Sequence, residues 1–548
     1  MGDRAFRWIT LAFALTPVVL IVLIGQRLLA NSALTRHAFG WRFLTTSTWD
    51  PVHGLYGALP FIFGTVVTSA VALALSVPLG VGCAIFLAEY APARLSAVLS
   101  FLIELLAAIP SVIYGLWGFL VLCPWMQEKV NPWLAERFGS VPLFGGPPVM
   151  TNMLAAGLVL SVMVLPFIAA VSRDVLKLVP EQSRLASLAL GATKWETIRS
   201  VVLPSARSGI AGAVMLALGR AIGETMAVVM VVGNDPTIHA SLLQPGYTMP
   251  ALLANQFNES YTDPLQLSAL LEIALVLFVI TLIINALARA MILLMGRQGG
   301  GGSIGPAAGR VVAGALSVAR WAVRLGVAAL LVRQIVHDVS AHGLRGLLGG
   351  AEAIVLAYVS VRVATAWSMG TPFWRTWRSL NAGAMRVLLA GTTALASLVL
   401  SLLFYYVGSQ GMKAFKLTLF TQLPVPPGEP GGGVKNAIVG TLVLVGLASA
   451  IGIPIGIGGA VYLSEFGRTR LGGLVRFCAD VLSGIPSVVI GMFAYAMFVL
   501  PFGHFSAASG GAALAVMMIP TITRTTEEML RLVPVGFREA SLALGGSR

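Results

Sequence analysis

Long apolar runs dominate this 548-residue chain, and they restrict its possible folds more than any other feature of the sequence. Hydrophobic residues make up 57% of the chain, charged residues make up only 11%, and the mean hydropathy is +0.87. Soluble globular proteins are typically about 25% charged and about 45–50% apolar. The composition therefore excludes a water-soluble enzyme and a disordered chain. It predicts an all-α integral membrane protein whose spans each use about 20 mainly apolar residues.

The apolar runs predict a polytopic helical bundle of about 10–12 spans. Arg4 and Arg7 precede the first run, but no clear cleavage site follows it, so we interpret it as a retained span. Arginines interrupt the seventh and eighth runs, which could instead be helices lying in the membrane interface. The runs cover roughly residues 8–26, 58–88, 96–122, 151–171, 208–233, 267–296, 311–332, 349–367, 384–407, 436–463, 475–502 and 508–523.

The distribution of basic residues predicts how the chain is oriented. The net charge is +14, but no basic run is long enough for a nucleic-acid patch, so we expect no nucleic-acid partner. Loop 173–207 carries six Lys and Arg residues, whereas loop 234–264 carries none. Basic residues collect on the cytoplasmic side of membrane spans. Loop 173–207 is therefore predicted to be cytoplasmic, and counting spans backwards places the N-terminus in the cytoplasm as well.

The chain contains an internal repeat. Residues 109–112 (IPSV) recur at 485–488, an offset of 376, and several single Gly, Pro and Glu positions share that offset. Further along, the offset becomes 354, and residues 180–191 match 534–545 at eight of twelve positions. The first half thus holds 22 additional residues, which we place in the outer loop around 124–150. Two similar halves of equal orientation predict a parallel repeat around a central path.

A glycine-rich linker, Gly299 to Gly302, separates the two halves. We predict a first half of six spans over 1–298, a linker with extra apolar segments over 299–383, and a second, incomplete half over 384–548. If 299–383 crosses the membrane twice, the second half begins on the same side as the first.

The cytoplasmic segment 180–204 has the pattern of a short helix followed by a turn. Pro180 opens it, Gly191 interrupts it, and Leu203 and Pro204 lead into the next span. A helix that ends at glycine can turn sharply without a Cβ clash. The pattern predicts a compact unit suited to a groove in a partner protein, although an ordinary amphipathic loop is the alternative.

This segment resembles the EAA loop of ABC importer permeases, in which Glu-Ala-Ala is followed after three residues by Gly. The second half carries the match as Glu539, Ala540, Ser541 and Gly545. In the first half Leu185 replaces the glutamate, followed by Ala186, Ser187 and Gly191. The resemblance implies that both loops dock into a cytoplasmic ABC ATPase dimer, and that the first loop lacks one charged contact.

The resemblance extends to the phosphate-specific ABC importers. Residues 55–90, 107–118 and 218–234 are similar to the C-type permease subunit, and residues 431–441, 452–465 and 483–493 are similar to the A-type subunit. It implies a fusion of both subunits in a bacterial cytoplasmic (inner) membrane. It also implies inward movement of phosphate delivered by an extracytoplasmic phosphate-binding protein. A permease for another oxyanion and a non-transporting regulator or scaffold of phosphate signalling are the alternatives.

Arg220 and Glu224 lie in the predicted span 208–233, four residues apart and hence on one helix face. Charges at that depth normally face the bundle interior and form pairs. The two residues are interpreted either as a structural ion pair or as part of an anion path, in which arginine attracts phosphate oxygens. Glu272 and Arg289 are interpreted as structural or interfacial. Prolines recur inside spans of both halves and predict kinks, which are interpreted as fold geometry, with hinges as the alternative (Pro78, Pro110, Pro166, Pro454, Pro486 and Pro520).

No G-x-x-x-x-G-K-[ST] sequence occurs, so the chain itself is not expected to bind ATP through a P-loop. We predict no catalytic residue, no metal site and no bound cofactor, with ATP and Mg²⁺ used by the partner ATPase. The three cysteines lie in apolar runs without paired spacing and predict no disulfide. The sequence stops at Arg548, before counterparts of the last two spans of the first half, and we therefore expect it to be a fragment, with a truncated product as the alternative.

Overall fold

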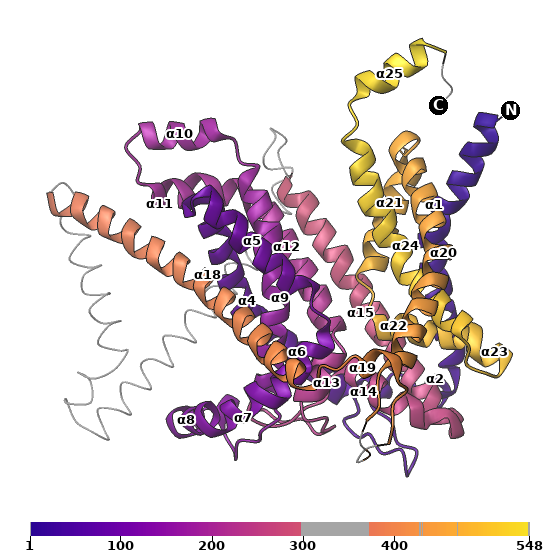
Figure 1. The fold of residues 1–548 in the computed structure, drawn as a ribbon. Coiled ribbons are helices and arrows are strands. Elements are labelled where there is room, and N and C mark those ends of the chain that lie inside the picture. The colour runs from indigo at the N-terminus through magenta and orange to yellow at the C-terminus, as the bar shows by residue number, and fades with distance from the viewer. Residues whose placement is uncertain (1, 297–371, 427–428, 430, 468, 546–548) are drawn as a thin grey trace. The chain divides into compact units, whose positions relative to one another are not determined.

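The computed structural model describes residues 2–296, 372–426, 429, 431–467 and 469–545, and Figure 1 shows that this part of the chain is built from helices. The described residues contain two isolated β-bridges and no strand. The predicted all-α membrane architecture is confirmed. The weaker predicted spans 311–332 and 349–367 and the linker from Gly299 to Gly302 lie outside the described residues.

Seven helices of the described chain are long and apolar enough to cross a membrane, or up to nine spans if each of two bent helix pairs counts as one. The seven are Ala5–Asn31, Leu59–Tyr90, Met153–Lys177, Lys194–Gly223, Pro264–Ala290, Leu380–Lys413 and Lys435–Glu465.

The first part of the chain, to residue 296, comprises α1 (Gly2–Asn31), α2 (Ala33–Phe39), α3 (Arg42–Thr45), α4 (Leu59–Ile85), η1 (Phe86–Tyr90), α5 (Ala93–Ala108), α6 (Ser111–Trp117), η2 (Gly118–Leu122), α7 (Cys123–Trp125), η3 (Met126–Val130), α8 (Asn131–Phe138), η4 (Pro142–Phe144), α9 (Met153–Lys177), α10 (Glu181–Ala189), α11 (Lys194–Thr197), η5 (Ile198–Val202), α12 (Leu203–Gly223), α13 (Met226–Val231), α14 (Met249–Gln256), η6 (Phe257–Thr262) and α15 (Pro264–Gly296). The second part comprises α18 (Pro372–Ala414), α19 (Thr418–Thr421), α20 (Lys435–Glu465), α21 (Arg470–Ser483), α22 (Ser487–Ala494), η8 (Tyr495–Val499), α23 (Leu500–Phe502), α24 (Ala507–Arg531) and α25 (Val535–Ala543).

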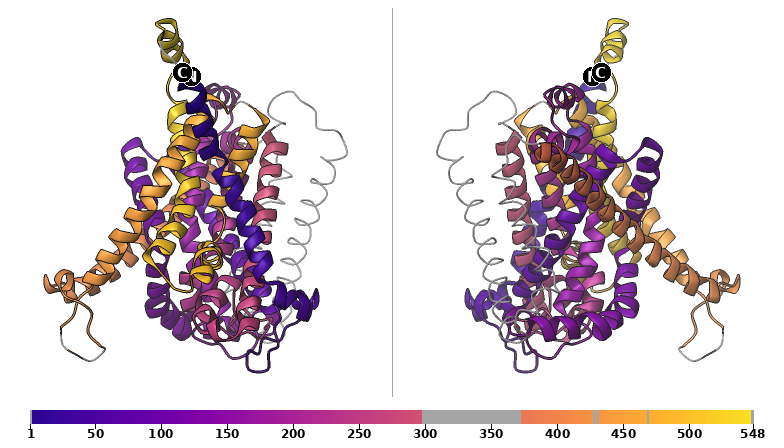
Figure 2. Two further views of the ribbon diagram at one scale, coloured as in Figure 1. Left: turned by 90° about the vertical axis from the view of Figure 1, so that its right-hand side faces the viewer. Right: turned by 90° about the vertical axis from the view of Figure 1, so that its left-hand side faces the viewer.

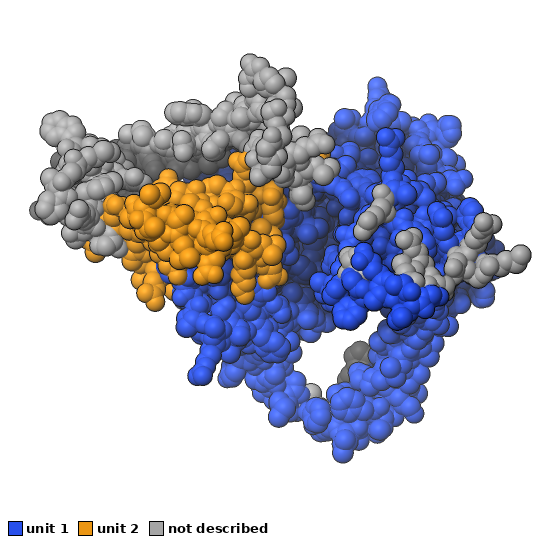
Figure 3. Space-filling view, turned by 90° about the horizontal axis from the view of Figure 1, so that it is seen from above, with its two compact units in different colours: residues 1–173, 210–289, 392–548 blue, residues 174–209, 290–391 orange. Residues whose placement is uncertain are grey.

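The helices belong to two compact units, coloured separately in Figure 3. One unit contains residues 1–173, 210–289 and 392–548, and it holds most of the membrane-length helices. The other contains residues 174–209 and 290–391, and therefore the whole of α10 and α11 together with the start of α18.

Two predicted spans are wrong in shape, because each bends at a proline. Residues 96–122 were predicted as one span, but the chain bends by 91° between α5 and the helices after it. Residues 475–502 were also predicted as one span, but the chain bends by 99° between α21 and α22. The residue before a proline is displaced from helical geometry. Ile109 accordingly has ψ 132° ahead of Pro110. Pro110 and Pro486 have nearly identical backbone angles, φ −57° with ψ 138° and φ −56° with ψ 137°.

Two further predicted spans differ at their ends. The prediction for 208–233 was one continuous span, but the helical run begins at Lys194, ends at Gly223, and resumes as the separate helix α13. The prediction for 508–523 corresponds to α24, which continues to Arg531 through charged residues and is not among the seven membrane-length helices.

The predicted internal repeat is present in the helix boundaries. Helices α9 and α24 begin and end at positions that differ by 354, as do α10 and α25. Helices α4 and α20 begin 376 residues apart, and α6 and α22 do the same. The additional residues of the first half form η3, α8 and η4, within the predicted segment 124–150.

Glycines allow the same close helix crossing in both halves. A Cβ atom on Gly80 of α4 would lie 2.9 Å from Ile168 of α9, and a Cβ atom on Gly456 of α20 would lie 2.6 Å from Ile522 of α24. Real Cβ atoms do not approach other atoms this closely. These two pairs of helices therefore pack at a distance that only glycine permits.

The first long helix of each half packs against the other half. Ala14 of α1 is fully buried in a cluster with Tyr462 and Val475 of α20 and α21, and α1 runs beside α20 in Figure 1 and Figure 2. In the same way, Leu400 and Leu403 of α18 are buried in a cluster made mainly by helices of the first half. Because lipid tails are as apolar as these side chains, close packing rather than exclusion of water stabilises the contacts between the two halves.

Candidate functional site

The first predicted coupling loop forms a helix, a turn and a second short helix. Pro180 precedes α10 with φ −58°, and Gly191 follows α10 with φ +82°, a conformation that a side chain would strain. Thr193 and Glu196 then form a capping box at the start of α11, with Glu196 Oε2 accepting from Thr193 N at 2.8 Å. The predicted compact helix–turn unit is therefore present.

The side chains of this loop divide between internal support and exposure. Ser187 Oγ lies 3.0 Å from Thr197 Oγ1 and ties α10 to the next helix. Arg184 donates to the carbonyl oxygen of Leu176 at 2.7 Å. Ala186, Leu185 and Leu188 are exposed, and Leu190 is 90% exposed. The support lies on one side of α10, while an apolar face of the same loop is open to a partner.

The second predicted loop repeats this form. Helix α25 is followed by Gly545 with φ +85°, and Leu544 N donates to Ala540 O at 3.1 Å. Glu539, Ala540 and Ser541 are exposed, and so is Phe537, at 72%. The two loops thus present matched helix–glycine units, one with Leu185 and the other with Glu539 at the equivalent position. The assignment of these residues to ATPase coupling stays a prediction.

Leu203 and Pro204 were expected to lead into the next span, and they stand at the first two positions of α12. The π-helical segment η5 ends immediately before them. All five π-helical segments of the described residues end two residues before a proline (Pro92, Pro124, Pro132, Pro204 and Pro501). A proline ring clashes with the carbonyl of an α-helical turn and cannot donate a hydrogen bond, and a wider turn relieves that clash.

Arg220 and Glu224 do not share a helix face, so that part of the sequence prediction is wrong. Helix α12 ends at Gly223, where an added Cβ would lie 2.9 Å from Pro486. The Arg220 guanidinium lies 4.2 Å from the ring centre of Phe167. Glu224 Oε1 accepts from Ala227 N at 3.2 Å. Within the described residues no ion pair joins Arg220 to Glu224, and their role in an anion path stays a prediction.

Glu272 and Arg289, which we interpreted as structural, both lie beside an opposite charge. Glu272 Oε2 is 3.9 Å from Arg36 Nη1, and Arg289 Nη1 is 2.8 Å from Asp480 Oδ2. The second contact joins α15 of the first half to α21 of the second.

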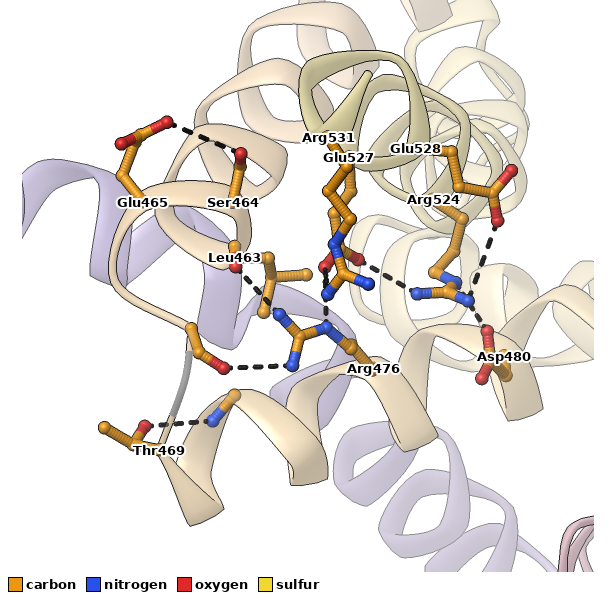
Figure 4. A network of polar contacts seen from close by, with 12 residues as sticks. Leu463, Ser464, Glu465, Thr469, Arg476, Asp480, Arg524, Glu527, Glu528 and Arg531 are labelled. Atoms are coloured by element: carbon orange, nitrogen blue, oxygen red, sulfur yellow. Dashed lines mark hydrogen bonds and ion pairs between the residues drawn. The ribbon is translucent and has the colours of Figure 1, made fainter. Parts of the chain in front are cut away.

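A larger charged network occupies the end of α24 that precedes α25 (Figure 4). The side chain of Glu527 is 1% exposed and accepts from three arginines, at 2.6 Å from Arg476, 2.9 Å from Arg524 and 2.7 Å from Arg531. Arg524 also reaches Asp480 at 2.7 Å. A buried carboxylate needs such partners, because an unpaired charge in the interior is very costly.

Arg476 also supports the backbone around the end of α20. Its guanidinium donates to the carbonyl oxygens of Leu463 at 2.8 Å and Gly467 at 2.9 Å. These carbonyls lie at a helix C-terminus, where no intrahelical donor remains. The network therefore fixes α20, α21 and α24 to one another.

This network was not predicted from the sequence, although the repeat contained a signal for it. The offset of 376 relates Glu104 to Asp480, and the offset of 354 relates Arg173 to Glu527. Arg173 and Glu104 form an ion pair of 3.0 Å between α9 and α5. Charged residues that align across a repeat inside apolar runs thus indicate interhelical pairs.

The architecture defines a class of protein: a multi-pass helical membrane protein made of two repeated permease halves, each with an exposed helix–glycine loop. The chain belongs to the family described as the binding-protein-dependent transport system inner membrane component, which it matches over residues 76–295 and 452–548, more than half of its length. It is therefore an inner-membrane permease of the ABC importer type, and its place in the membrane is confirmed at that level.

Three curated relatives carry the name phosphate transport system permease protein PstC. The protein of Mesorhizobium japonicum is 44% identical over 297 residues, 54% of this chain and 90% of the relative. That of Haemophilus influenzae is 44% identical over 53% of this chain and 93% of the relative. PstC 1 of Mycobacterium tuberculosis is 38% identical over 53% and 92%.

The similarity to PstC covers the N-terminal half of the chain, and the family match at 452–548 lies beyond it, as expected of a fusion. A solved chain of the MetNI methionine ABC transporter is 21% identical over 43% of this chain and 94% of its own length. Its TM-score is 0.29, which is too low to inform the fold.

Proposed function

We propose that this chain is the transmembrane subunit of an ATP-driven importer that moves inorganic phosphate inward. The observation that carries the proposal is the pair of exposed helix–glycine loops, α10 with Gly191 and α25 with Gly545, in a chain whose N-terminal half is 44% identical to proteins named as phosphate permeases.

The exposed faces of the loops support docking to a cytoplasmic ABC ATPase dimer. Leu185, Leu188 and Leu190 form an exposed apolar surface on the first loop, and Phe537 and Leu544 do so on the second. Short helices with apolar anchors are well suited to a groove in a partner. ATP binding and hydrolysis, with Mg²⁺, take place in that partner, and this chain contributes translocation without a bound cofactor of its own.

In this proposal an extracytoplasmic phosphate-binding protein delivers the anion to the face opposite the loops, and the N-terminus is cytoplasmic. Movement of the coupling helices shifts the attached spans between two arrangements, as alternating access requires. Arg220, beside the break between α12 and α13, is the candidate for contact with phosphate oxygens in the path.

The test is uptake of radiolabelled phosphate into vesicles that contain the chain, with MgATP and an ABC ATPase on the loop side and a phosphate-binding protein on the other. We expect uptake that depends on all three, and that unlabelled phosphate suppresses better than sulfate or molybdate does. Stronger suppression by sulfate or molybdate would identify a permease for another oxyanion. ATPase binding without uptake or stimulation would favour a regulator.

A matched pair of variants tests the docking surface. Leu190→Asp places a charge on the exposed apolar face of the loop, so we expect at least a tenfold loss of ATP-dependent uptake. Leu178→Asp is the control, because Leu178 is equally accessible, at 81%, but lies before α10. Equal losses for the two variants would contradict docking through this face.

A further inference from the structure

Arg378 of helix α18, the helix that leads from the linker segment into the second half, contacts the first coupling loop. Arg378 Nε lies 2.6 Å from Glu196 Oε1, and Arg378 Nη2 bonds to Glu196 Oε2. The same Nη2 donates to the carbonyl oxygen of Gly191 at 3.1 Å. The three residues belong to the same compact unit. A guanidinium fork of this kind fixes direction as well as distance, which a lysine ammonium would not do.

The contacts of Arg378 lie on both sides of the turn between α10 and α11. Gly191, with φ +82°, follows α10, and a Cβ placed there would find no atom of the described residues within 4 Å, so the space beside its Cα is open. Its carbonyl oxygen is at the C-terminal end of α10, where helical carbonyls lack intrahelical donors. On the other side, Glu196 caps α11 by accepting from Thr193 N. Arg378 thus joins the end of one helix to the start of the next.

We propose that Arg378 is a positioning residue for the first coupling loop, holding the α10–Gly191–α11 turn in the form that docks to the ATPase. The proposal rests on the proposed function for its docking step and on the structure alone for the turn. Arg378 lies in the segment predicted as linker, two residues before the span that begins at Leu380, so the residue that positions the loop of the first half is supplied by the connection between the two halves.

The charge balance of the two loops agrees with this role. Glu196 is occupied by a residue of the same chain, and its hydrogen bond with Arg378 raises the pKa of that guanidinium. Glu539 of the second loop is exposed and open to a partner. The first loop has Leu185 in place of that glutamate, and its Glu196 is bound by Arg378 of the same chain.

The first experiment measures the mobility of the turn directly. A spin label at position 190 (Leu190→Cys) is suitable because Leu190 is exposed and the native cysteines Cys83, Cys123 and Cys478 are buried. We expect Arg378→Ala and Glu196→Gln each to raise label mobility, and the exchange Arg378→Glu with Glu196→Arg to restore part of the order. Arg386→Ala, an exposed arginine on the same helix, should leave mobility unchanged. Unchanged mobility in Arg378→Ala would overturn the proposal.

The second experiment measures binding of the ABC ATPase to the full chain in detergent. Both side chains are about one-third exposed, so we expect a loss of about three- to fivefold in affinity for Arg378→Ala, with Arg378→Lys between it and the parent chain. If the parent chain binds and Arg378→Ala binds equally well, the positioning role is wrong and the proposed function stands. If the parent chain does not bind, the proposed function fails, and the label mobility still decides whether Arg378 holds the turn.

Discussion

The two halves share their helix crossings but differ in the charges that join the same helices. Gly80 of α4 against Ile168 of α9 has its counterpart in Gly456 of α20 against Ile522 of α24, at the offsets of the repeat. In the first half, α5 supplies an acid, Glu104, and α9 supplies a base, Arg173. In the second half, the acid Asp480 of α21, which is the counterpart of Glu104, pairs with Arg524 of α24, and a further pair of opposite sense joins Arg476 of α21 to the acid Glu527 of α24.

This difference shows which interactions set the geometry. A glycine crossing depends on atomic contact and admits few alternatives, because interiors are close-packed. An ion pair requires only that the two signs be opposite, so pairs of either sense fit between the same two helices. In the second half the acid Glu527 is buried and also contacts Arg524 and Arg531. Asp480 connects the same network to Arg289 of the first half.

The largest expected effect comes from removing the carboxylate at the centre of the network. Glu527→Ala leaves Arg476, Arg524 and Arg531 without their shared partner, and breaking a buried pair typically costs about 3–5 kcal/mol. Thermal unfolding of the detergent-solubilised chain, with denaturant titration where it is reversible, measures the loss. Glu528→Ala is the control, since the neighbouring side chain is 69% exposed. Similar stabilities for the two variants would show that burial of Glu527 contributes little.

The next effect concerns the crossing that both halves share. Gly456→Val forces α20 away from Ile522 and should lower the free energy of unfolding by about 1–3 kcal/mol. Gly446→Val, on the same helix, is the matched control, because no atom lies within 4 Å of a Cβ at that position. Gly80→Val should resemble Gly456→Val. If only one of the two crossing variants destabilised the chain, the halves would not depend on a common packing geometry.

The sequence predicted the class of fold because apolar length and repeat offsets act over whole helices. The recurring prolines predicted kinks at Pro110 and Pro486 but not bends of 91° and 99°, since counting apolar residues cannot distinguish a kinked span from a broken one of equal composition. For the same reason the sequence did not predict that α12 ends at Gly223, where the constraint comes from Pro486, 263 positions away.

The loops were predictable as local units, because Pro180, Gly191 and Gly545 impose their turns through backbone conformation. The contact of Arg378 with Glu196 was not, because it joins residues 182 positions apart and leaves no periodic pattern in either segment. The buried network around Glu527 was partly predictable. Its members are distant in sequence, but the repeat offsets align two of them with Glu104 and Arg173.

The smallest effect is expected at the ion pair of the first half. Glu104 is 55% exposed at its side chain, so solvent weakens its attraction to Arg173, and exposed pairs contribute about 0.2–1 kcal/mol. A double-mutant cycle with Glu104→Gln and Arg173→Gln isolates the coupling energy from the other contacts of Arg173. The equivalent cycle with Glu527→Gln and Arg476→Gln should give a coupling energy several times larger, because Glu527 is buried. Equal coupling in the two cycles would mean that burial of Glu527 does not strengthen its pair with Arg476.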